Sequence, residues 1–145
     1  MLYVMCGLPS SGKTTIAKQI EEEKNIIRYS FDEIEGSNTP DGHNLAFQKF
    51  CECIRADLLS DKNVICDLIV TNSQRRRKFL SEFSDIECKK NIIVVDTSFE
   101  ECLRRNEQRG DCKTDILIMK VLYLTFQHPT LDEGWDEIIY YKGEW

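Results

Sequence analysis

Short apolar runs alternate with longer amphipathic segments along the chain. The runs are rich in β-branched residues and predict five strands, over residues 2–6, 25–30, 63–68, 91–96 and 137–141. Apolar positions at helical spacing predict helices over residues 13–24, 43–60, 73–83 and 116–126. Capping-box spacings at Thr97 and Ser98 predict a further helix after the fourth strand, and the turn-forming residues 36–42 predict a loop.

Strands that alternate with helices are typical of βαβ units. They predict an α/β fold, a three-layer α/β/α sandwich with a mostly parallel sheet of about five strands and helices on both faces. Ligands of such sheets bind at the carboxyl ends of the strands. The residues just after each strand are therefore the candidates for a functional site.

The size and composition of the chain indicate a globular protein. Its 145 residues match one domain, and its 41% hydrophobic and 30% charged residues exclude both disorder and a fibrous repeat. The net charge of −6 argues against binding of a nucleic-acid backbone over a large surface, although a narrow basic channel is compatible with it. The apolar runs are far shorter than the ~20 residues of a membrane span, and residues 1–6 lack the basic start of a signal peptide.

The cysteine pattern does not indicate a metal site. Seven cysteines and two histidines are present, without the spacing of a zinc site. We expect buried or half-buried thiols in a reducing compartment, and therefore a cytoplasmic protein without a membrane partner.

The segment between the first strand and the first helix carries the most specific motif. Residues 7–14 fit the pattern G-x-x-x-x-G-K-[ST], with a predicted strand before it and a helix after it. Its glycines let successive N–H groups face phosphate oxygens, and the helix N-terminus adds partial positive charge. Lys13 is suited to the β- and γ-phosphates and the Thr14 hydroxyl to Mg²⁺. The predicted ATP-binding residues of the loop are Gly7, Leu8, Pro9, Ser10, Ser11, Gly12, Lys13, Thr14 and Thr15.

Kinases, GTPase switches and ATPase motors all contain this loop. The Asn-Lys-x-Asp segment with which switch GTPases read guanine is absent from the sequence. A motor ATPase usually needs a longer chain and an arginine from a neighbouring subunit. The short chain and the arginines late in its sequence therefore favour a phosphotransferase with a lid.

Two carboxylates follow predicted strands. Asp32 comes after the second strand, where it is suited to accept the proton of an attacking hydroxyl, with Glu33 as the neighbouring candidate. The alternative is that Asp32 caps the next turn. Asp67 ends the third strand and is a candidate to bind Mg²⁺ directly or through water, or else a structural strand-end carboxylate.

Three arginines lie late in the helix predicted after the fourth strand. Arg105 and Arg109 are four residues apart, which predicts that they share one helix face. Arg109 precedes a glycine and is the candidate to close over the transferred phosphate from a lid around residues 105–115, with Arg105 as a further ATP-binding residue. For Arg104, surface pairing with Glu100 is the favoured interpretation.

Residues 75–78, Arg-Arg-Arg-Lys, form the one dense basic run. Such runs are usually a solvated helix face. Arg75 and Arg76 lie one turn before apolar residues of the same helix, so they are candidates to bind an acceptor that carries phosphate.

These motifs resemble, in order and over nearly the whole chain, the polynucleotide-kinase-like P-loop kinases, which have an AAA-type ATP-binding kinase domain. The segments that carry the resemblance are residues 7–15, 30–34, 71–76, 105–109 and 129–138. The resemblance implies a kinase domain over residues 1–145 that uses ATP and Mg²⁺, with Lys13, Asp32 and Arg109 as catalytic residues. Seryl-tRNA kinases and zeta-type toxins look like more distant relatives.

The sequence departs from the family on the acceptor side. Glu35 stands where the family has an arginine that holds the phosphate of the acceptor, and the segment from Asp67 to Asn72 is two residues longer. The predicted function is transfer of the γ-phosphate of ATP to a hydroxyl, with a polynucleotide 5′-hydroxyl as the first candidate. The alternatives are a kinase for a nucleoside, nucleotide or sugar nucleotide, and a nucleotide-binding regulatory ATPase.

Overall fold

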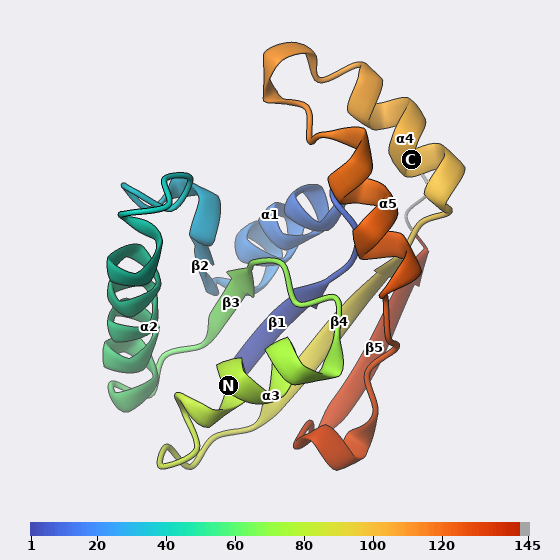
Figure 1. The fold of residues 1–145 in the computed structure, drawn as a ribbon. Coiled ribbons are helices and arrows are strands. Elements are labelled where there is room, and N and C mark those ends of the chain that lie inside the picture. Colours follow the sequence, from blue (N-terminus) through green and yellow to red (C-terminus); the bar gives the residue numbers. More distant parts are fainter. Residues whose placement is uncertain (143–145) are drawn as a thin grey trace.

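The computed structural model describes residues 1–142 and contains a five-stranded sheet (Figure 1). The strands are β1 (Leu2–Cys6), β2 (Ile27–Ser30), β3 (Val64–Asp67), β4 (Lys90–Asp96) and β5 (Glu137–Lys142). They are ordered β2-β3-β1-β4-β5, and every neighbouring pair is parallel. The predicted α/β fold is confirmed. Because β1 is the central strand, the loop that follows it lies between the ends of β3 and β4.

Five α-helices connect the strands. They are α1 (Lys13–Lys24), α2 (His43–Leu59), α3 (Ser73–Ser81), α4 (Phe99–Glu107) and α5 (Ile116–Leu124). Three single 3₁₀ turns accompany them, η1 (Phe31–Glu33), η2 (Gly110–Cys112) and η3 (Leu131–Glu133). The second strand begins later than predicted because Asn25, at φ 53°, ends α1 in the left-handed conformation.

Side chains of β1 alternate between the two faces of the sheet and define its two cores. Leu2 and Val4 pack in the larger core, which includes Phe50 of α2 and Phe79 of α3. Met5 points the other way and packs with residues of α1. The helices therefore form a layer on each face, as the period-two pattern of the strands requires.

Helices α4 and α5 pack against each other beyond the carboxyl ends of β1 and β4 (Figure 1). Cys102 of α4, Met119 and Leu122 of α5, and Leu8 of the loop after β1 form their shared core. The side chain of Ile116, which contributed to the helical spacing, is exposed. No helix within residues 1–142 combines the length and the apolar character that a membrane crossing requires.

Candidate active site

The loop from β1 to α1 has a backbone that only small residues permit. Ser10 and Gly12 have positive φ angles of 64° and 103°. A Cβ atom on Gly7 would lie 2.7 Å from the Ser11 hydroxyl oxygen and 3.1 Å from the Val95 carbonyl oxygen, so this position has no room for a side chain. The glycines of the motif are therefore explained by the local geometry.

The loop has the polar groups of a phosphate cradle. Ser11 is buried, and its hydroxyl has no hydrogen-bond partner within residues 1–142. Gly12, the N-cap of α1, supplies no side-chain cap, so the first N–H groups of the helix are left for another acceptor. A polyphosphate would satisfy these donors, and the loop therefore fits the phosphates of ATP.

Helix α4 and the end of β4 anchor the loop from one side. The carbonyl oxygen of Ser11 accepts hydrogen bonds from the Thr97 hydroxyl at 2.6 Å and from Nη1 of Arg105 at 3.1 Å. Arg105 also pairs with Glu101 at 3.0 Å. The side chain of Arg105 thus contacts the backbone of the phosphate loop. Arg104 is turned outward and pairs with the same Glu101, whose pKa it lowers to about 2 together with Arg105.

Arg109 reaches the loop from outside α4. The helix ends at Glu107, so the prediction that Arg105 and Arg109 share a helix face is wrong. Nη1 of Arg109 nevertheless lies 3.2 Å from the Ser10 hydroxyl oxygen.

A buried asparagine closes the segment that carries Arg109. The side-chain amide of Asn106 donates to the Thr114 carbonyl and accepts from the Thr114 N–H, both at 2.8 Å. Residues 107–113 therefore form a loop that is tied at its base and exposed at its tip.

A hydroxyl, a carboxylate and an ammonium meet where β3 ends beside the phosphate loop. The Thr14 hydroxyl donates to Oδ2 of Asp67 at 2.6 Å, and Nζ of Lys13 lies 3.8 Å from Oδ1 of Asp67. Asp67 is buried, with 6% of its surface exposed. Hydroxyl and carboxylate oxygens are the ligands that Mg²⁺ prefers, and Mg²⁺ usually keeps several waters and phosphate oxygens besides. The residues present therefore fit Mg²⁺ held together with a nucleotide.

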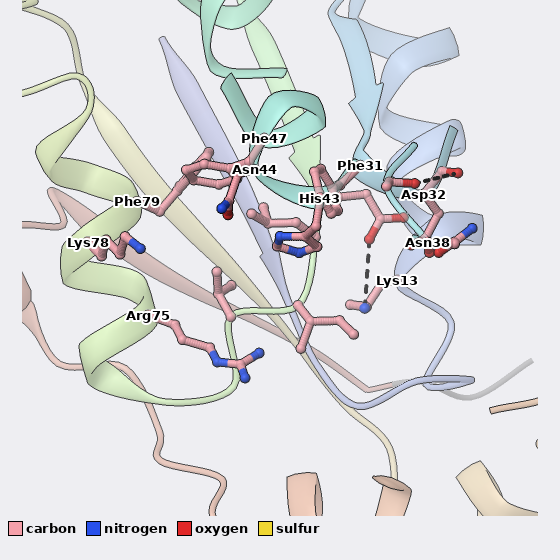
Figure 2. Close-up of a pocket in the computed structure, with 15 residues that line it drawn as sticks. Lys13, Phe31, Asp32, Asn38, His43, Asn44, Phe47, Arg75, Lys78 and Phe79 are labelled. Carbon is pink, nitrogen blue, oxygen red and sulfur yellow. Dashed lines mark hydrogen bonds and ion pairs between the residues drawn. The ribbon is translucent and has the colours of Figure 1, made fainter. Parts of the chain in front are cut away.

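A cleft of about 420 Å³ opens beside these groups (Figure 2). Lys13, Asp32 and Asn38 lie on one side of it, and Arg75 and Lys78 of α3 lie on the opposite side (Figure 2). The wall between them is lined by three aromatic side chains and by two polar residues at the start of α2. The aromatic residues are Phe31, Phe47 and Phe79, and the polar residues are His43 and Asn44. Asp32 belongs to η1, directly after β2, and its side chain is exposed to the cleft.

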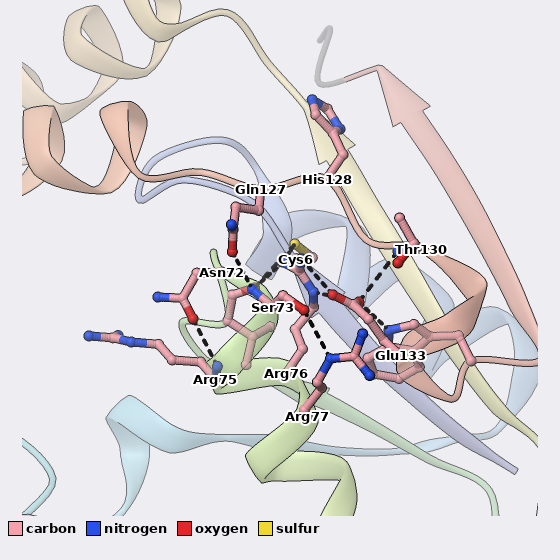
Figure 3. Close-up of polar contacts among 12 residues, drawn as sticks. Cys6, Asn72, Ser73, Arg75, Arg76, Arg77, Gln127, His128, Thr130 and Glu133 are labelled. Atoms are coloured by element: carbon pink, nitrogen blue, oxygen red, sulfur yellow. Dashed lines mark hydrogen bonds and ion pairs between the residues drawn. The ribbon is translucent and has the colours of Figure 1, made fainter.

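The basic run on α3 divides into three different environments. The side chains of Arg75 and Lys78 line the cleft, and neither has an ion-pair partner in the described part of the chain. Arg77 points outward to Asp132. Arg76 is fully buried and pairs with Glu133 at 2.8 and 3.0 Å (Figure 3). The prediction that Arg76 binds an acceptor is therefore corrected, because neither solvent nor a ligand reaches its guanidinium.

Several residues of the site carry no clear sequence signal. His43 and Asn44 open α2 after the loop of residues 36–42, and nothing in their spacing relates them to Asp32. Asn106 lies in the segment 105–109 that carries the resemblance, but its structural role is not evident until its partner eight residues later is known. Lys78 follows Arg75 by three residues, so the i,i+3 rule could have placed both on one face.

The chain belongs to a known protein family. A family model described as an AAA domain matches residues 2–117. The chain therefore belongs to this AAA-domain family, and its fold is that of the P-loop kinases, which confirms the resemblance seen in the sequence. No curated protein sequence matches the chain at a significant level.

Solved structures share the fold at low sequence identity. A sugar kinase from Janibacter sp. superposes with a TM-score of 0.74 at 16% identity, over 98% of this chain and 84% of that one. Kti12 from Chaetomium thermophilum, in complex with ADP-AlF3, gives 0.74 at 17% identity, over 98% and 89% of the two chains. A chain of the Pnkp1/Rnl/Hen1 RNA repair complex gives 0.71 at 20% identity, over 84% of this chain and 41% of that one.

Proposed function

We propose that this protein is an ATP-dependent phosphotransferase that moves the γ-phosphate of ATP to a hydroxyl group bound in the cleft. The observation that carries the proposal is the composition of that cleft. One side presents Lys13 and Asp67 beside the phosphate loop together with Asp32, and the opposite side presents two cations. A site with both a donor end and an acceptor end is what phosphoryl transfer between two molecules needs.

The donor end would bind the polyphosphate of ATP. The N–H groups of residues 7–15 and the Lys13 ammonium would hold the β- and γ-phosphates. Thr14 and Asp67 would hold Mg²⁺, which when bound neutralises part of the phosphate charge. Arg109, already 3.2 Å from Ser10, would close over the γ-phosphate from a lid around residues 105–115 of a single kinase domain.

Asp32 would act as the general base. Its carboxylate lines the cleft at the end of β2 and has no side-chain partner within residues 1–142, so it is available to an incoming hydroxyl. The neighbouring Glu33 pairs instead with Arg28 on the outside of the fold. This difference in surroundings favours Asp32 over Glu33.

Arg75 and Lys78 would bind an anionic group of the acceptor. Two cations without a carboxylate partner on a cleft wall are expected to attract phosphate or carboxylate. A polynucleotide 5′-hydroxyl is the first acceptor to test, because the next phosphate of the strand supplies such an anion. The cleft volume of about 420 Å³ also suits a single nucleotide or sugar phosphate, which favours a small-molecule kinase as the second candidate.

The proposal is tested with γ-labelled ATP and Mg²⁺. The protein is offered 5′-hydroxyl DNA and RNA oligomers in one set of reactions and pooled nucleosides, nucleotides and sugar phosphates in another. We expect label on an acceptor of one set, and steep loss of acceptor affinity with salt if that acceptor is a polynucleotide. Label that appears only as free phosphate, at a rate no acceptor changes, would contradict the proposal and favour a regulatory ATPase.

A further inference from the structure

The buried pair of Arg76 and Glu133 connects α3 to η3 (Figure 3). Nε and Nη2 of Arg76 donate to the two carboxylate oxygens of Glu133, and Nη1 donates to the Val70 carbonyl oxygen at 3.0 Å. All three nitrogens of the guanidinium are therefore used inside the protein. Glu133 also accepts a hydrogen bond from the indole of Trp135 at 3.0 Å.

The Val70 carbonyl accepts hydrogen bonds from two residues that lie far apart in the sequence. Besides Arg76, the thiol of Cys6 donates to it at 3.5 Å. Cys6 directly precedes Gly7, the first residue of the phosphate loop. Leu68, Ile69 and Val70 line the cleft. One carbonyl oxygen thus connects the start of the donor loop to the wall that faces the acceptor.

A second set of hydrogen bonds ties the same wall to the segment before Glu133. The N–H of Gln127 donates to the Thr71 carbonyl, and the Gln127 side chain accepts from the Ser73 N–H, both at 2.9 Å. The segment 127–133 is therefore hydrogen-bonded to the segment 68–73 and helps to fix its position. The Arg76–Glu133 pair is the buried and charged part of this support.

We propose that Arg76 is a positioning residue for the acceptor, and that Glu133 holds its guanidinium in place. A planar guanidinium with fixed donors sets the position of a carbonyl more tightly than apolar packing can, because its hydrogen bonds are directional. Val70 lines the cleft, so a shift of its peptide changes the cleft wall, while the phosphate loop keeps two further anchors of its own on Thr97 and Arg105. The proposal rests on the proposed kinase function for its kinetic readout but not for its structural one.

The test compares Arg76→Lys with Arg77→Lys. Lysine keeps the charge at position 76 but lacks the planar fork whose separate nitrogens bind the two Glu133 oxygens and the Val70 carbonyl. Arg77 is a matched control, because it also links α3 to η3, through Asp132, but on the exposed surface. In protein shown to be folded by circular dichroism, we expect Arg76→Lys to raise the KM for the acceptor at least about tenfold and to change the Kd of ATP less than twofold. Arg77→Lys should change neither.

Amide hydrogen exchange provides a readout that needs no acceptor. In Arg76→Lys, exchange of the amides of residues 68–71 should accelerate at least about tenfold, while the amides of α1 keep their rates. Glu133→Gln is the second variant and should show the same pattern. Equal acceleration in α1 and in residues 68–71, or an unchanged acceptor KM, would show that the pair only holds the fold together. Failure of every acceptor in the transfer assay would contradict the kinase proposal, and the exchange pattern would still decide the positioning proposal.

Discussion

The hydroxyl of Thr14 donates a hydrogen bond of 2.6 Å to Oδ2 of Asp67, so the first turn of α1 and the end of β3 share one polar contact beside the phosphate loop. The contact joins residues 53 positions apart in the sequence, and Lys13 lies at 3.8 Å from the other carboxylate oxygen. A hydroxyl and a carboxylate at this distance are positioned to bind the same divalent cation.

Replacement of Asp67 should weaken the response to magnesium. Asp67→Asn keeps the shape of the side chain but removes its charge. We expect the Mg²⁺ concentration for half-maximal turnover to rise at least about tenfold. Asp96→Asn is the control, because Asp96 also ends a strand of the sheet, β4, but is exposed. Equal Mg²⁺ requirements in the two variants would mean that Asp67 has only a structural role.

Replacement of Arg109 should affect the chemical step more than nucleotide binding. Arg109→Ala is expected to lower kcat by about a thousandfold, since an arginine acts on charge that develops in the transition state. The Kd of ATP should stay within threefold of the original. Arg104→Ala is the matched control, because among residues 1–142 Arg104 pairs only with Glu101, on the surface. A kcat that falls equally in both variants would exclude a specific role for Arg109.

The Arg76–Glu133 pair should be important for stability. Arg76→Met leaves the Glu133 carboxylate buried without its counter-charge, and we expect the free energy of unfolding to fall by about 3–5 kcal/mol. Arg77→Met removes an exposed pair and should cost less than about 1 kcal/mol. Urea unfolding at pH 7 measures both. Similar losses in the two variants would contradict the difference in burial.

The same pair should make stability depend on pH. Burial acts to raise the pKa of Glu133, but hydrogen bonds from Arg76 and Trp135 outweigh it and hold the pKa below its ordinary value of 4.5. A carboxyl with a lowered pKa stabilises the fold above its ordinary pKa, and this stabilisation is lost as pH falls through the lowered value. Glu133→Gln should therefore be less stable at pH 7 and lose less further stability below pH 4.5. Parallel curves of unfolding free energy against pH for the two proteins would contradict this assignment.

Local patterns were sufficient to predict the fold and the position of the loop between β1 and α1. The β-branched runs and the G-x-x-x-x-G-K-[ST] motif act over a few neighbouring residues, so each can be read without knowledge of distant contacts. The prediction for Arg76 failed for the opposite reason. Its partner Glu133 lies 57 positions away, and charged side chains are almost never fully buried unless they are paired.

Helix ends limited the prediction around the lid. The four-residue spacing of Arg105 and Arg109 suggested one helix through Arg109, yet α4 ends at Glu107 and the chain turns. Just before this end, Asn106 makes two hydrogen bonds to Thr114, a contact that no local pattern encodes. The cleft wall formed by α2 and α3 could not be predicted from the sequence either, because it combines residues of these two helices across the ends of β2 and β3.

The most direct test of the proposed kinase compares Asp32→Asn with Glu33→Gln. The two carboxylates are adjacent, but Asp32 lines the cleft and Glu33 pairs with Arg28. With the acceptor that the labelling assay identifies, we expect Asp32→Asn to lower single-turnover transfer by about 10²–10⁴ while the Kd of ATP stays unchanged. Glu33→Gln should transfer phosphate at the original rate. Full transfer by Asp32→Asn would contradict its role as the base and with it the proposed mechanism.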